Sequence, residues 1–140
     1  MIVMMVRDVM TRQVVTIGPE TRCEKARRMM DEHRIRHLPV VDTGRLVGMV
    51  SDRDVRSAAS GLPGAVAARI MTPDPVTVTS ETRIEHAAHL MLDARFGAVP
   101  VVDDSALVGI ATYTDLLRAF VQVIETATLE RIAIEVAGGQ

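Results

Sequence analysis

The sequence predicts an α/β (α+β) fold in which two tandem copies of a small βαββα unit pack about a pseudo-twofold axis. The first observation is an internal duplication, because residues 6–58 align with residues 67–119 without a gap and 20 of the 53 aligned positions are identical. The second is that each copy changes from a short β-branched run to helical spacing and then to two apolar strands. A period of 61 residues that occurs only twice is longer than that of common solenoids, so we expect one shared core.

Each copy is expected to open with a strand and a helix. In the first copy the run VVTI at 14–17 is β-branched, and the segment after it has helical spacing with one apolar stripe. The stripe consists of Cys23, Ala26 and Met30 in the first copy and of Ile84, Ala87 and Met91 in the second. The residue pairs that match a capping box at the start of this helix are Thr21 with Glu24 and Thr82 with Glu85.

A β-hairpin and a second helix complete each copy. The apolar runs LPVVD and RLVGMV flank the turn DTGR, which is typical of a hairpin, and the last helix is predicted to begin at Ser51 or Thr112. The stretches LVGMVSDRDV and LVGIATYTDL share the motif Gly-x-x-(Ser/Thr)-x-x-Asp. Its glycine falls inside a strand, where glycine usually indicates a bulge or the close approach of another backbone.

The duplication also predicts the domain boundaries. Residues 1–60 form the first repeat, 61–66 a linker, 67–126 the second repeat and 127–140 a C-terminal extension. The residues that indicate the linker are Gly61, Pro63 and Gly64. The extension has two interpretations, because apolar residues continue at near-helical spacing while IAIEV alternates like a strand. It is either a long helix for dimer contact or the first strand of a further domain.

Composition narrows the class of partner. With 16 basic and 18 acidic residues the net charge is −2, so no broad field favours nucleic acid or an anionic membrane. The chain has three aromatic residues, too few for stacking platforms. The opening run MIVMMV is too short to span a bilayer and lacks the features of a signal peptide. We therefore expect a cytoplasmic protein that binds neither nucleic acid nor membrane.

Catalytic and metal chemistry are not indicated. There is no Ser-His-Asp set, glycine-rich phosphate loop or paired-carboxylate arrangement, so no catalytic residue is assigned and the chain is not expected to be an enzyme. His33 with His37 and His86 with His89 have spacings that metal ligands use, but the second pair lies off the apolar stripe, and no metal site is assigned. The single cysteine, Cys23, lies on the buried stripe and excludes an internal disulfide.

The duplicated Ser/Thr-x-x-Asp has two interpretations. A capping box accounts for both side chains without a ligand. A helix start also presents free amides and the positive end of the helix dipole, and a carboxylate there can accept hydrogen bonds from two neighbouring hydroxyls, as in a ribose. The motif is therefore predicted to cap a helix and to build a ribose site twice.

The duplicated pattern MT…VVT, a helix, HRIRHLPVVD and G-x-x-(S/T)-x-x-D resembles the cystathionine-β-synthase (CBS) domain family over residues 6–119. The resemblance implies a non-enzymatic sensor, with no required cofactor, of adenosine-containing ligands such as AMP, ADP, ATP, S-adenosylmethionine or NAD. It also implies a homodimer and an unidentified regulated protein as partners. The alternative is a structural or protein-interaction module whose pockets are vestigial.

The resemblance implies a set of ligand-binding residues. In the family the aspartate holds the ribose, and the Ser/Thr lies beside ribose and phosphate. Adenine enters a slot between the entry to the first strand and the start of the second, and the matching segments here are Thr11 to Val14 with Ile35 to Leu38 and Thr72 to Pro75 with Phe96 to Val99. Basic residues just before the second strand face the phosphates, and they are present in the first copy as Arg36 and His37 but replaced in the second by Gly97 and Ala98. The two pockets are therefore expected to be unequal. The full set is Thr11, Val14, Ile35, Arg36, His37, Leu38, Ser51, Arg53, Asp54, Thr72, Pro75, Phe96, Gly97, Ala98, Thr112, Thr114 and Asp115.

Overall fold

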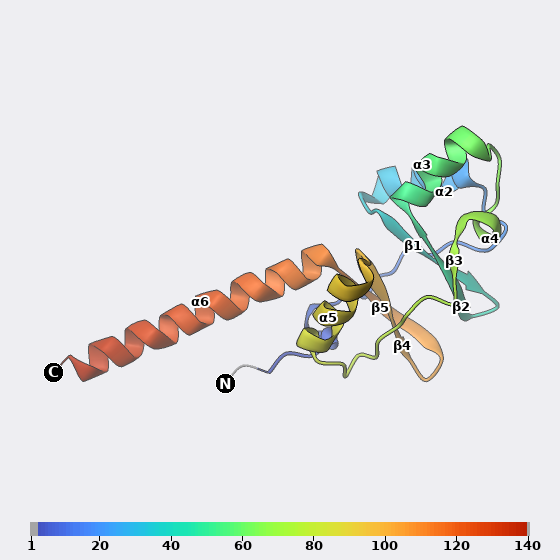
Figure 1. Ribbon diagram of the computed structural model, residues 1–140. Helices are drawn as coiled ribbons and strands as arrows, with labels where there is room; N and C mark the ends of the chain where they lie inside the picture. The colour runs from blue at the N-terminus through green and yellow to red at the C-terminus, as the bar shows by residue number, and fades with distance from the viewer. Residues whose placement is uncertain (1–2, 140) are drawn as a thin grey trace.

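The computed structural model describes residues 3–139 and contains two similar halves and one long helix that extends away from them (Figure 1). Each half holds a helix, a β-hairpin and a second helix, as the duplication predicts. The first half consists of α2 (Cys23–His33), β1 (His37–Asp42), β2 (Arg45–Ser51) and α3 (Asp52–Gly61). The second consists of α5 (Ile84–Ala94), β4 (Ala98–Asp103), β5 (Ala106–Thr112) and α6 (Tyr113–Gly138). Three short elements precede or join them: α1 (Val6–Val9), α4 (Ala67–Ile70) and β3 (Thr72–Pro73).

The two hairpins are built alike. Strands β1 and β2 pair antiparallel, as do β4 and β5, and the register shifts once in each pair, between Val40 and Val41 and between Val101 and Val102. The predicted opening strand at 14–17 was wrong in extent, because only Ile17 forms a bridge, parallel to Val40. The backbone before Ile17 pairs with the second repeat, where Thr11 bridges Ile110 of β5, so it does not lie along the hairpin of its own repeat.

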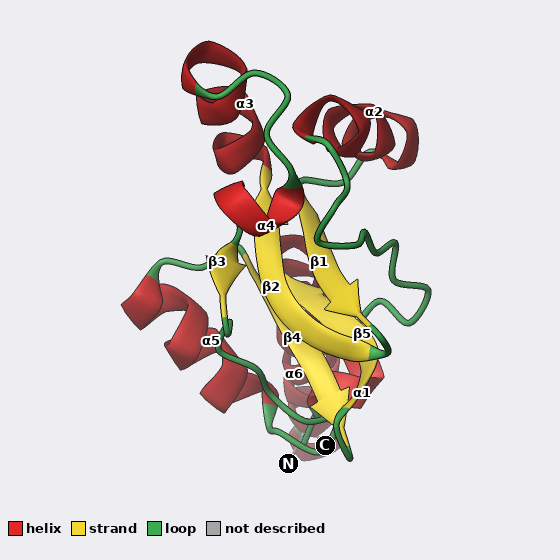
Figure 2. Cartoon of the chain, turned by 90° about the vertical axis from the view of Figure 1, so that its right-hand side faces the viewer, coloured by secondary structure: helices red, strands yellow, loops and turns green. Residues whose placement is uncertain are grey.

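The segments that enter each repeat add to the sheet of the other repeat. Thr11 exchanges two backbone hydrogen bonds with Ile110 of β5, at 2.9 and 3.0 Å. In the same way β3 pairs antiparallel with β2, which makes the order β1-β2-β3. The strands of both halves lie side by side in the middle of the molecule (Figure 2), and β2 contacts β5. The two repeats are therefore joined by exchanged backbone as well as by apolar packing.

The exchange extends to the cores. Val6 and Met10, at the start of the chain, are buried in the core of the second repeat with Ala87 and Met91 of α5. Ala67 of α4 is buried in the core of the first repeat with Ala26 and Met30 of α2. A third cluster, Met49, Ala98 and Ile110 with Val14 against it, joins the halves. Neither repeat completes its core without residues that precede the other, which explains why the stable unit is the pair.

The strand glycines confirm the predicted close approach of another backbone. A Cβ on Gly109 would lie 2.6 Å from the Met10 sulfur and 3.0 Å from the Thr11 carbonyl oxygen. A Cβ on Gly48 would meet the Met71 sulfur and lie 3.1 Å from the Thr72 carbonyl oxygen. Glycine at these two positions is what allows the entry segment to cross over the strand.

Replacing Gly109 with alanine is expected to destabilise the protein by about 1–3 kcal/mol, because the added methyl forces the crossing backbone to move. Urea unfolding measures the change. The matched control is Gly61→Ala at the end of α3, where nothing lies within 4 Å of the added atom. Equal free energies of unfolding for Gly109→Ala and the parent would contradict the crossing.

Two of the four predicted capping boxes were wrong. At the start of α2 the N-cap is Arg22, without a side-chain cap, and Thr21 accepts a hydrogen bond from the Gly18 amide at 3.1 Å. Glu24 accepts from the Gly64 amide at 2.8 Å, and Thr82 accepts from the Thr79 amide at 3.0 Å. At the start of α2 the linker supplies part of the cap, because the Ala65 carbonyl accepts a hydrogen bond from the Cys23 amide at 2.8 Å. The boxes at the starts of α3 and α6 are confirmed.

The C-terminal extension is helical, so the strand interpretation of IAIEV was wrong. Helix α6 runs for 26 residues to Gly138 and carries many exposed apolar side chains. They are Leu117, Phe120, Val121, Ile124, Leu129, Ile132, Ile134 and Val136. Within residues 3–139 no helix combines the length and the apolar character needed to cross a membrane. Positions 1–2 and 140 of the predicted domain ranges lie outside the described residues.

Candidate functional site

Two cavities lie between the repeats, and each contains one of the duplicated aspartates. The Asp54 cavity has a volume of about 510 Å³ and the Asp115 cavity about 710 Å³. Each takes its aspartate from one repeat and its apolar wall from the other. The Asp54 cavity combines the start of α3 with residues 72–76 and 95–98, and the Asp115 cavity combines the start of α6 with residues 11–15 and 34–37. The crossing of the entry segments produces this arrangement.

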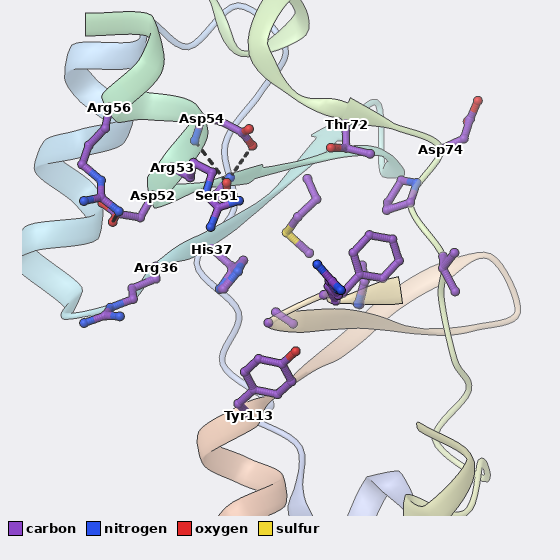
Figure 3. A pocket seen from close by; sticks show the side chains of 18 residues that line it. Arg36, His37, Ser51, Asp52, Arg53, Asp54, Arg56, Thr72, Asp74 and Tyr113 are labelled. Atoms are coloured by element: carbon purple, nitrogen blue, oxygen red, sulfur yellow. Dashed lines mark hydrogen bonds and ion pairs between the residues drawn. The ribbon is translucent and has the colours of Figure 1, made fainter. Parts of the chain in front are cut away.

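In the Asp54 cavity the capping box leaves part of the carboxylate available. Asp54 accepts from the Ser51 amide at 2.8 Å through Oδ2, and Ser51 Oγ accepts from the Asp54 amide at 3.1 Å (Figure 3). The other oxygen, Oδ1, makes no hydrogen bond to any residue in the range 3–139, and the side chain is half-buried. A half-buried acceptor with one occupied oxygen is suited to hydroxyl donors of a ligand.

The rest of the cavity lining contains apolar and basic residues. The apolar residues Pro75, Val76, Phe96 and Ala98 come from the second repeat. The basic residues are Arg36, His37, Arg53, Arg56 and Arg95. Arg56 is paired with Asp52 at 2.9 Å, and Asp74 adds a further negative charge to the wall.

Asp115 is more enclosed than its counterpart. It is 5% exposed, and its Oδ2 accepts from the Thr112 amide at 3.0 Å, while Thr112 Oγ1 accepts from the Asp115 amide at 3.2 Å. The Thr11 hydroxyl lies 3.5 Å from both carboxylate oxygens, and Arg118 lies 3.7 Å from Oδ1. The two repeats thus hold the same cap in different surroundings.

One set of residues borders both cavities, and we call it the shared wall: Arg36, His37, Gly97 and Tyr113. His37 points into the space between the start of α3 and Tyr113 (Figure 3). A Cβ on Gly97 would lie 3.0 Å from His37 Cε1 and 3.2 Å from its Nε2, so the absence of a side chain there makes room for the imidazole. The basic residues that distinguish the first repeat therefore serve both cavities.

Burial sets the protonation of His37. Desolvation lowers the pKa of His37 below its ordinary value of 6.5, and the nearby carboxylates of Asp54 and Asp52 oppose this effect without reversing it. The positive charge of Arg36 lowers the pKa further. The shared wall accordingly holds a neutral imidazole at neutral pH, ready to take up a proton when a negative group approaches.

The free energy of unfolding is expected to fall as the pH is lowered through 6.5. Because the folded pKa of His37 is lowered, the unfolded chain binds a proton there that the folded chain does not, and stability is lost until the pH passes below the folded pKa. Thermal unfolding between about pH 5 and pH 8 measures this, with His37→Gln as the comparison. The variant should show a smaller pH dependence, and an unchanged profile would contradict the assignment.

The structure brings every predicted site residue except Leu38 to one of the two cavities. Leu38 is fully buried in the core of the first repeat, because alternate residues of β1 face opposite sides and its neighbour His37 faces the cavity. Arg53 lines the Asp54 cavity, and Thr114, at the equivalent position of the second repeat, lines the Asp115 cavity. The two sites therefore differ by an arginine against a threonine at this position. Cys23 is buried, and His33, His86 and His89 are exposed.

Several lining residues were not found by sequence reasoning. In the Asp54 cavity they include Asp52, Arg56, Asp74, Val76, Arg95 and Tyr113. In the Asp115 cavity they include Gln13, Val15, Arg34 and Arg118. The usable signal is the repeat offset itself: Asp74, Pro75 and Val76 align with Gln13, Val14 and Val15, so a wall found in one copy predicts the wall in the other.

Known proteins share this architecture. The family model for the CBS domain matches residues 6–61 and 66–122. The CBS domain-containing protein YhcV of Bacillus subtilis is 35% identical over 114 residues, which cover 79% of this chain and 81% of that protein. The match spans both repeats and most of the relative.

Two solved structures of CBS pairs hold adenosine compounds. The structure of CBSX2 of Arabidopsis thaliana in complex with AMP matches with a TM-score of 0.76 and 35% identity, covering 85% of this chain and 97% of that one. The CBS domain pair of protein MJ0100, in complex with 5'-methylthioadenosine and S-adenosyl-L-methionine, matches with a TM-score of 0.80 and 30% identity, with the same coverage. Two matched repeats, the exchanged entry segments and the twofold G-x-x-(S/T)-x-x-D motif lead to one conclusion: this chain belongs to the CBS domain family and forms a pair of CBS domains.

Proposed function

We propose that this CBS pair is a non-enzymatic regulatory module that binds adenosine-containing ligands in its two cavities. The observation that carries the proposal is the composition of each cavity, in which a capped aspartate faces an apolar wall supplied by the other repeat. The ligand class comprises AMP, ADP, ATP, S-adenosylmethionine and NAD. CBSX2 holds AMP and the MJ0100 pair holds S-adenosylmethionine, which supports this class.

The lining of the Asp54 cavity supports one way of holding such a ligand. The carboxylate accepts hydrogen bonds from the ribose hydroxyls through its available oxygen. The flat base gains from desolvation against Pro75, Val76 and Phe96, where neighbouring backbone groups read its edge. Phosphates turn toward Arg36 and His37 of the shared wall and toward Arg53. Each of these contacts uses a residue of this chain, and none requires a cofactor or a metal.

The proposal includes a cytoplasmic homodimer that acts on an unidentified regulated protein. Helix α6 supports the dimer, because Leu117, Phe120, Val121 and Ile124 are about half or more exposed and lie along one side of the helix. The same feature favours a second candidate function, an interaction module in which α6 makes the essential contact and the cavities are vestigial.

Thermal unfolding with and without AMP, ATP, S-adenosylmethionine, NAD and adenosine separates the two functions. A ligand at about one hundred times its dissociation constant is expected to stabilise the folded chain by about 2.7 kcal/mol. Guanosine 5'-monophosphate serves as the matched control for the base. Stabilisation by at least one adenosine compound supports the sensor, and the absence of any shift at millimolar concentration favours the interaction module.

A further inference from the structure

The chain has one basic pair at the wall where its pseudo-symmetry would supply two. Arg36 and His37 of the first repeat align with Gly97 and Ala98 of the second. Both basic residues border both cavities, so neither cavity has a pair of its own. One basic pair between two binding sites can make its full set of contacts with only one ligand at a time.

The position of His37 in the shared wall depends on the glycine at position 97. The His37 ring occupies the space next to Gly97, where any side chain would approach its Cε1 to 3.0 Å. The Tyr113 amide donates to the Gly97 carbonyl at 3.1 Å, which fixes the backbone at this point of the wall. An arginine at position 97, the counterpart of Arg36, would therefore push the imidazole away from the shared wall.

No other basic residue borders both cavities. Arg118 in the Asp115 cavity is engaged with Asp115 at 3.7 Å, and Arg56 in the Asp54 cavity is engaged with Asp52 at 2.9 Å. Arg53 and Arg95 line only the Asp54 cavity and Arg34 lines only the Asp115 cavity, so none of them lies between the two sites. A second phosphate at the shared wall would meet the first phosphate, and the repulsion between two phosphates across a partly buried wall is weakly screened.

We propose that the two cavities are negatively coupled through Arg36 and His37, so that the chain takes one phosphate-bearing adenosine ligand and one phosphate-free adenosine ligand together. Two phosphate-bearing ligands compete for the same Arg36 guanidinium and the same His37 imidazole, which donates to a phosphate through a ring N–H. A neutral ligand needs only the aspartate and the apolar slot, and it binds beside a nucleotide without loss. This inference rests on the proposed function and assigns its two sites different ligand classes.

Calorimetric titration of the full chain tests the coupling with AMP and adenosine as probes. Because charge-assisted contacts are lost, the second AMP is expected to bind about tenfold or more weakly than the first. Adenosine should bind the AMP-saturated chain with an affinity within about twofold of its affinity for one site of the free chain. A chain titrated with adenosine alone should take up two molecules.

Variants identify the residues that couple the sites. Arg36→Ala/His37→Ala should weaken the first AMP until both AMP sites are alike, and it should weaken adenosine, which has no phosphate, by a smaller factor than AMP. Gly97→Ala should weaken AMP by displacing the His37 ring, whereas Arg69→Ala, an exposed arginine that borders neither cavity, should change nothing. Circular dichroism confirms that each variant is folded.

The outcomes separate the inference from the function on which it rests. Two equal and independent AMP sites in the parent, or an unchanged ratio of the two AMP affinities in Arg36→Ala/His37→Ala, would overturn the coupling and leave the adenosine sensor standing. Failure of AMP and adenosine to bind at millimolar concentration would overturn the coupling, and failure of every adenosine compound in the thermal unfolding series would overturn the proposed function itself.

Discussion

Asp115→Ala is expected to lower the free energy of unfolding by about 2 kcal/mol and to abolish binding in the Asp115 cavity. The carboxylate is 5% exposed and accepts from the Thr112 amide at 3.0 Å, so its removal leaves a donor at the start of α6 without its partner. The Thr11 hydroxyl and Arg118 lose their shared acceptor in the same step. Urea unfolding measures the stability, and calorimetry with adenosine measures the binding.

Two matched variants separate the cap from the ligand contact. Asp54→Ala removes the equivalent residue where the carboxylate is less enclosed, so it should destabilise by about 1 kcal/mol, less than Asp115→Ala. Asp115→Asn keeps an oxygen for the Thr112 amide, and it should restore most of the stability while binding stays about tenfold or more weaker. Equal losses of stability at the two aspartates would contradict the difference in their surroundings.

Val121→Asp combined with Ile124→Asp is expected to convert the proposed dimer to a monomer at tens of micromolar chain. Both side chains are about half exposed, at 51% and 48%, and they share the apolar side of α6 with Leu117 and Phe120. Burying a large aliphatic side chain contributes about 1.5–3 kcal/mol, and an unpaired buried carboxylate costs several more. Sedimentation equilibrium measures the change in mass.

The control lies on the same helix. Gln122→Asp adds one charge at an exposed position away from the apolar side, so it should leave the dimer intact. Circular dichroism should show the same helix content in all three proteins, because none of the substituted side chains is buried in a core. A parent chain that sediments as a monomer under these conditions would contradict the dimer.

The elements of the fold were predictable where the signal is local. The stripes of α2 and α5, the hairpins and the caps of α3 and α6 all depend on residues within a few positions of one another. The false boxes at Thr21 and Thr82 show the limit of this reasoning. Their pattern, Thr-x-x-Glu, is as good a capping-box signal as the Ser/Thr-x-x-Asp at Ser51 and Thr112. At the start of α2, however, the Ala65 carbonyl and the Gly64 amide of the linker bond the Cys23 amide and the Glu24 carboxylate, and at the start of α5 the Met4 carbonyl accepts from the Ile84 amide.

The exchange between the repeats was not predictable from periodicity. Met10 and Thr11 cross to Gly109 and Ile110, and nothing within the sequence of either repeat identifies that partner. The strand glycines indicated that a backbone approaches, and only the fold shows that it comes from the other repeat. The same crossing determines which aspartate faces which apolar wall.

The site was predictable as a set of residues but not as two assembled cavities. The repeat motif identified Asp54 and Asp115, and the resemblance to the family identified the slots, yet the pairing of acid with slot depends on the exchange. Arg56 and Arg118 were missed because they belong to no motif, and their charges matter only once the cavities are closed. The shared wall likewise depends on the contact between His37 and Gly97, which are 60 residues apart.

A crystal structure of the full chain with AMP tests the central claim, that each cavity joins the aspartate of one repeat to the apolar wall of the other. For a ligand whose ribose is held by Asp54, the account predicts the base against Pro75, Val76 and Phe96 and the phosphate at Arg36 and His37. A base seated against Val14 and Ile35 while its ribose contacts Asp54, or AMP bound outside both cavities, would contradict the account.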